Sequence, residues 1–149
     1  MFGALKKALG AGAKEIKNDY SGNKDFLEAV CAAAALVAAS DGDIEESERR
    51  KIVSLIQNHS VLGKSYDARV IENTAEEMLK KAKDSSGRAQ LARELMDVKS
   101  KTDGMQMAED AYLVGLDIAN SDGELEPQEE ETLKKIASLL GVDPSRFVF

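Results

Sequence analysis

The chain has 149 residues, of which 27 are acidic and 20 are basic, and its formal charge is −7 at pH 7. This balance argues against a nucleic-acid-binding protein, because phosphates are met by clustered Lys and Arg. No apolar run approaches the roughly 18 residues that would indicate a membrane span, and the single cysteine excludes an intrachain disulfide. The sequence therefore predicts one soluble, globular, cytoplasmic domain spanning residues 1–149.

Residues 1–22 are expected to begin the domain with a short amphipathic helix. We favour packing of its apolar stripe on the domain's own core, because the stripe is short and its polar face carries few charges. The alternative is a peripheral contact of residues 2–17 with an anionic membrane surface or a partner. The apolar stripe and the basic face consist of Phe2, Leu5, Leu9, Ala13 and Ile16, and of Lys6, Lys7, Lys14 and Lys17.

The rest of the chain repeats its apolar residues at helical spacing, and no segment alternates with the period of a strand. Gly, Asp and Pro separate the apolar stripes at positions typical of turns and helix caps. This pattern predicts an all-α domain of about seven helices. Pro144 and Phe147 are expected to close the chain in one short turn.

An internal repeat organises this helical chain. Shifting the sequence by 81 residues aligns residues 38–48 with 119–129, and six of the eleven positions are identical. Each unit, 26–59 and 107–140, is predicted to be a helix, an acidic turn and a second helix. We expect the units to pair as a pseudo-symmetric four-helix core, with the small residues Ala34 and Gly115 allowing close helix approach.

The two acidic turns contain the residues that would start and stop these helices. Gly42 and Gly123 are predicted to end the first helix of each unit in the left-handed conformation. Pro127 at the first helical position makes Glu126 the predicted N-cap, and Glu45 takes the same place by the repeat. The acids that follow are favoured by the helix dipole, so capping alone explains most of each turn.

Asp41 and Asp122 fit this explanation less well, because a carboxylate near a helix carboxyl terminus is disfavoured. Their presence in both turns suggests a cation, and oxygen-rich turns without Cys or His suit a hard one such as Ca²⁺. The spacing is not that of an EF-hand. From the residues alone, a capped turn without metal is favoured over a dedicated calcium site. The candidate ligands are Asp41, Asp43, Glu45, Glu48, Asp122, Glu124, Glu126 and Glu129.

Residues arranged for catalysis are missing from the sequence. His59, the only imidazole, lies near the end of the helix that begins after Glu45, where a capping or dipole role is expected. Cys31 falls inside an Ala-rich apolar segment and is expected to be a buried small hydrophobe. We therefore expect a protein that is not an enzyme.

The doubled motif Ala-x-Ser-Asp-Gly-[Asp/Glu]-[Ile/Leu]-Glu-x-x-Glu, together with the tail at residues 140–147, resembles the tellurite-resistance TerB family. The resemblance implies an all-helical, non-catalytic cytoplasmic module of the tellurium-resistance and stress-response system. It implies divalent-cation sites at the acidic turns and an adaptor role beside TerC-type membrane proteins and TerD-type calcium-binding proteins. The alternative is a metal-free interaction domain whose acidic face docks a basic partner.

Overall fold

The computed structural model describes residues 19–101, 104–121 and 125–147. Over these ranges the chain forms seven α-helices and one 3-10 helix, without a strand, which confirms the all-helical prediction. Of the predicted N-terminal helix, residues 1–18 lie outside the described residues, and residues 19–22 form a turn with Gly22 at a φ of +79°, so the helix does not extend to residue 22 as predicted. The helices are α2 (Lys24–Ala38), α3 (Glu46–Gln57), α4 (Ser60–Ser65), α5 (Ala68–Lys81), α6 (Ser85–Val98), α7 (Gly104–Asn120), α8 (Pro127–Leu140) and the terminal η1 (Pro144–Phe147).

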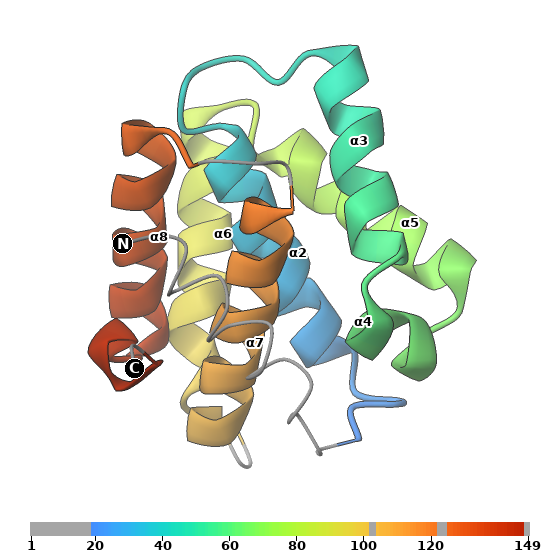
Figure 1. The fold of residues 1–149 in the computed structure, drawn as a ribbon, viewed down its shortest axis with the longest axis vertical. Helices are drawn as coiled ribbons and strands as arrows, with labels where there is room; N and C mark the ends of the chain where they lie inside the picture. The colour runs from blue at the N-terminus through green and yellow to red at the C-terminus, as the bar shows by residue number, and fades with distance from the viewer. Residues whose placement is uncertain (1–18, 102–103, 122–124, 148–149) are drawn as a thin grey trace.

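Helix α2 is the centre of the bundle, with α6 and α8 to one side of it and α3 and α5 to the other (Figure 1). Its middle, from Ala29 to Ala35, is buried on every face. A helix without a polar face must be surrounded by other elements. The Ala-rich sequence of α2 meets this requirement, because small side chains let α5, α6, α7 and α8 all pack directly against it.

Helix α7 approaches α2 most closely where both carry small residues. A Cβ atom placed on Gly115 would lie 3.4 Å from the Cβ of Ala33, at ordinary van der Waals contact. Any longer side chain at this position would have to displace α2, since protein interiors are close-packed. The first helices of the two units therefore approach closely at Gly115 as predicted, but the residue that faces Gly115 is Ala33, whereas the predicted Ala34 lines a pocket.

The segment between the two units is part of the core. Helices α5 and α6 both pack on α2, and they also contact α3 and α8 respectively. Buried residues such as Met78 and Leu91 belong to the same hydrophobic cluster as Phe26. Helices α5 and α6, which lie between the two units in the sequence, therefore join the units by packing in the same core, whereas the pseudo-symmetry of the four repeated helices stays a prediction. No helix in the described ranges is long and apolar enough to cross a membrane.

Candidate functional site between the acidic turns

The first acidic turn differs from its predicted geometry at the end of α2. The helix stops at Ala38 with Ala39 as a right-handed C-cap, and the N–H of Gly42 donates to the carbonyl of Ala39 at 3.2 Å. Gly42 therefore closes a separate turn, with φ of +124°, and the prediction that it directly caps the helix was wrong. The Ser40 hydroxyl explains the early stop, because it donates to the Val37 carbonyl at 2.7 Å.

The predicted N-caps are confirmed in both units. Glu45 and Glu126 have nearly the same backbone angles, with φ, ψ of −75°, 159° and −72°, 155°. Pro127 occupies the first helical position, where its missing N–H costs nothing. The Glu129 carboxylate accepts a hydrogen bond from the backbone N–H of Glu126 at 2.8 Å. The residues directly before α3 and α8 thus have the same backbone conformation.

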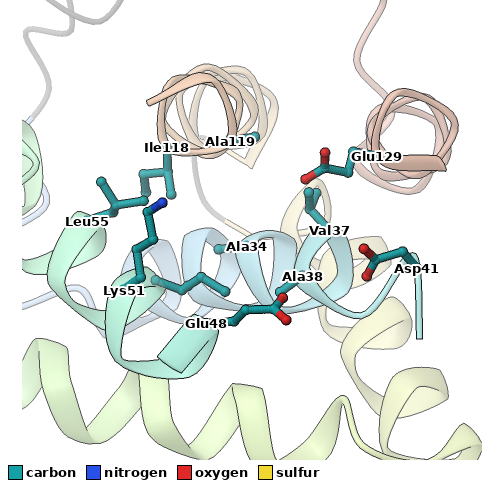
Figure 2. Close-up of a pocket in the computed structure, with 11 residues that line it drawn as sticks. Ala34, Val37, Ala38, Asp41, Glu48, Lys51, Leu55, Ile118, Ala119 and Glu129 are labelled. Carbon is teal, nitrogen blue, oxygen red and sulfur yellow. The ribbon is translucent and has the colours of Figure 1, made fainter. Parts of the chain in front are cut away.

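A pocket lies between the C-terminal end of α2, the N-terminal half of α3, the end of α7 and the start of α8, and its volume is about 100 Å³. Its floor is apolar and is built by α2, α3 and α7, while charged side chains from both units surround the opening (Figure 2). The lining residues are Ala34, Val37, Ala38, Asp41, Glu48, Lys51, Ile52, Leu55, Ile118, Ala119 and Glu129. Carboxylates that are 81 residues apart in the sequence therefore share one site.

The charges around this pocket are not mixed evenly. Figure 2 shows the carboxylates of Asp41, Glu48 and Glu129 directed toward the same end of the pocket, near Val37. The Lys51 side chain instead extends along α3 toward α7. One end of the pocket is thus acidic and the other end is basic.

The structure places the other candidate ligands elsewhere. Asp43 lines a separate hollow next to Lys83, and Glu45 and Glu126 are exposed capping residues that do not line the pocket. Asp122 and Glu124 lie outside the described residues. The part of the chain that the structure describes contains no group of three or more His, Cys, Asp or Glu side chains that could hold a metal ion. Its carboxylates alone therefore do not form a cation site.

His59 does act as a cap, although on a different helix from the one expected. Its Nδ1 accepts from the backbone N–H of Val61 at 3.2 Å and so caps the start of α4. Its Nε2 lies 2.7 Å from the Asp117 carboxylate, and the imidazole is only 7% exposed. Because Nδ1 accepts a hydrogen bond, the N–H of the neutral ring is on Nε2. This N–H donates a hydrogen bond to the Asp117 carboxylate. Both ring nitrogens are thus used in joining α4 to α7.

A second buried polar contact was not predicted from the sequence. The Asp110 side chain, on a residue only 4% exposed, accepts from the Tyr20 hydroxyl at 2.5 Å and from the Gln106 amide at 3.0 Å. The Tyr20 ring stacks on Phe26 with a centroid distance of 3.9 Å. The only feature of the sequence that could have indicated this contact is the acid Asp110 within the apolar stripe of α7. These contacts fix the chain before α2 to the first half of α7.

Two further titratable groups lie in or beside the core. Burial raises the pKa of the Cys31 thiol, and the nearby Glu28 and Glu94 raise it further, so that the thiol stays neutral. Glu94 lines a cleft between α2 and α6 together with Glu28, and its Oε2 atom is buried without a hydrogen-bond partner. Burial, followed by the charge of Glu28, raises the pKa of Glu94. Neither group lines the pocket between the acidic turns.

The fold and the pocket together define a small all-helical domain with an acidic surface hollow. The family model described as "Tellurite resistance protein TerB" matches residues 27–149. The chain therefore belongs to the TerB family, whose domains are in general non-catalytic. Comparison with curated proteins and with solved structures gives no significant match. The resemblance read from the doubled turn and the tail is thus confirmed.

Proposed function

We propose that this TerB-family chain is a non-enzymatic cytoplasmic adaptor of the tellurite-resistance and stress-response system, and that its pocket binds a positively charged ligand. The observation that supports this proposal is the arrangement of Asp41, Glu48 and Glu129, which come from the first turn, α3 and α8, hence from both repeat units, and line one pocket. Like charges gathered at one end of a pocket repel each other, and a cationic ligand relieves that repulsion. TerC-type membrane proteins and TerD-type calcium-binding proteins are the proposed partners of the adaptor.

The first candidate ligand is a hard divalent cation such as Ca²⁺. Carboxylate oxygens are the ligands that this ion prefers, and no Cys or His lines the pocket. The described carboxylates do not complete a three-ligand group by themselves. The cation candidate therefore requires Asp122 or Glu124, which follow Ser121 directly in the sequence of the second turn.

A calcium titration of the chelator-treated protein tests this candidate by NMR. We expect Ca²⁺ at millimolar concentration to shift the backbone amide resonances of residues 40–48 and 121–129. The double variant Asp41→Asn, Asp122→Asn should lose this response, whereas Glu131→Gln, an exposed α8 carboxylate outside the pocket, should keep it. Unmoved resonances in the unmodified chain, or equal responses of both variants, would rule out the cation.

The second candidate ligand is a basic surface on a partner protein. It is favoured by the apolar floor of the pocket, which a bare ion would leave uncovered. Binding of this kind weakens steeply with salt and is insensitive to chelator. A pull-down at low and high salt, each with and without chelator, separates the two candidates.

A peripheral membrane contact through residues 2–17 stays a separate prediction. It would bring the adaptor beside an integral membrane partner through the basic, amphipathic pattern of that segment. Deletion of these residues should reduce binding to anionic liposomes if the prediction is correct. Equal liposome binding by the full and shortened chains would contradict it.

A further inference from the structure

The floor of the pocket is an uncovered part of the hydrophobic core. Ala34 and Ala38 lie one turn apart on the same face of α2, and their small side chains leave a hollow between α3 and α7. Ile52, Leu55 and Ala119 border this hollow and are only partly buried. The hollow is thus an open apolar surface beside an otherwise close-packed core.

The size of the hollow limits what it can bind. Its volume of about 100 Å³ is well below the roughly 300–1,000 Å³ of pockets that hold small organic ligands. The space suits a single aliphatic side chain. A larger partner must then place one such side chain in the hollow and make its other contacts around the opening.

The charges around the opening determine which residues should flank that side chain. Asp41, Glu48 and Glu129 lie at one end of the hollow, whereas the Lys51 side chain extends toward Ile118 at the other. Complementary charges across an interface direct encounter and orientation. The acidic end therefore requires Lys or Arg on the partner, at a short distance from its apolar anchor.

We infer that the pocket binds a basic amphipathic helix of a partner protein, with one aliphatic side chain in the hollow and Lys or Arg against the three carboxylates. A helix places residues three and four apart within about 5–6 Å on one face, which brings an anchor and its basic neighbours together. This inference rests on the proposed function, since it identifies the positively charged ligand of the same pocket.

The experiment measures binding of a fluorescein-labelled helical peptide of about 18 residues, with Leu on one face and Lys on the other, to the full chain. Ala38→Leu fills the hollow from the half-buried side of α2, and we expect it to weaken binding about tenfold or more. Ala68→Leu, at the exposed start of α5, is the matched control and should bind normally. Circular dichroism verifies that each variant is folded.

A second pair of variants tests the acidic end. Glu129→Gln should weaken binding about two- to fivefold at low salt, as expected for an exposed charge pair, and Glu131→Gln should leave it unchanged. Absent binding, or equal binding to the Ala38→Leu and Ala68→Leu variants, overturns the inference. If Ca²⁺ shifts the turn resonances while the peptide does not bind, the inference fails and the proposed function stands. If neither ligand binds, both fail.

Discussion

The two repeat units enter their second helices alike but stabilise them differently. Glu45 and Glu126 have matching backbone angles, yet only the second unit adds a side-chain bond, from the Glu126 N–H to Glu129. In the first unit Arg49 forms ion pairs with Glu46 on its own helix and with Glu76 on α5. The same backbone path is therefore compatible with a local cap in one unit and a tertiary ion pair in the other.

The first helices of the two units, α2 and α7, also differ in the contacts that stabilise them. Helix α2 has an apolar, Ala-rich middle, whereas two acids of α7 bond residues from the first half of the chain. Asp110 accepts from Tyr20, and Asp117 accepts from His59. Both helices are buried on every face in their middle, but the middle of α2 is held by packing alone, whereas α7 is held by packing together with these polar contacts. The following predictions test this difference.

The largest change in the free energy of unfolding is expected at Gly115, whose surroundings differ from those of Ala34, the residue at the same position of the repeat. Gly115 faces Ala33 on α2, while its counterpart Ala34 borders the pocket. Gly115→Leu should lower the free energy of unfolding by about 3 kcal/mol through overpacking. Ala34→Leu should cost about 1 kcal/mol or less because the hollow accepts the added atoms. Urea denaturation measures both, and equal costs would contradict the packing difference.

A smaller loss is expected from removing the polar anchor of α7. Tyr20→Phe deletes one donor to the buried Asp110 carboxylate and should lower the free energy of unfolding by about 2 kcal/mol. Tyr66→Phe is the control, since its exposed hydroxyl donates only to the Asn23 carbonyl. We expect the control to cost about 1 kcal/mol or less. A thermal melt in which both variants unfold together would show that Asp110 is not an anchor.

The caps provide the next comparison. Glu129→Ala removes the bond to the Glu126 N–H as well as a favourable charge near the α8 N-terminus, and should cost about 1 kcal/mol. Glu48→Ala removes only the equivalent charge near the α3 N-terminus and should cost about 0.5 kcal/mol. Chemical denaturation at low salt compares the two. A greater loss for Glu48→Ala would mean that the local cap is not what distinguishes the units.

The smallest effect concerns the contact of α2 with α6, where Glu94 faces Glu28. The folded state raises the pKa of Glu94 through burial first and Glu28 second; Glu77 adds to this effect, whereas Lys81 and Lys101 oppose it. Because the pKa of Glu94 is raised in the folded state, its contribution to the free energy of unfolding is greatest at pH values below the ordinary pKa of 4.5. This contribution is lost as the pH rises above that value. Glu94→Gln should therefore flatten this decline.

At neutral pH the Glu94→Gln variant should have a free energy of unfolding about 0.5 kcal/mol higher than that of the unmodified chain. The increase is small because Glu94 is partly exposed to solvent. Denaturation midpoints measured from pH 4 to pH 8 would show the gain growing with pH. Glu72→Gln, an exposed α5 variant, serves as the control. A constant difference between Glu94→Gln and the unmodified chain across this range would contradict the assignment.

The features that were predicted from the sequence are those encoded within a few residues. Helical periodicity gave the fold class, Pro127 located the start of α8, and the tail pattern located the turn at Pro144–Phe147. The prediction for Gly42 failed because the Ser40 hydroxyl ends α2 earlier than the glycine would. Ser121 instead bonds the carbonyl of Asp117, four residues back, and α7 continues to Asn120, so the repeated Ser does not end both helices alike.

The candidate site depends on contacts between distant segments, and these were only partly predictable. The repeat identified Asp41, Glu48 and Glu129 as related residues, but nothing in the spacing showed that they share a pocket. The pair formed by His59 and Asp117 joins residues 58 positions apart. A single sequence contains no periodic signal for such pairs, because they arise only once the helices pack.

The burial of the only cysteine makes the chain convenient for kinetic measurements. Cys31 lies in the middle of α2 with its thiol held neutral, so a thiol reagent reacts with it only when the central helix is exposed. The rate of labelling therefore reports how often the whole core opens. A second cysteine introduced at the pocket rim would react much faster, which allows a dye to be attached there without removing the native thiol.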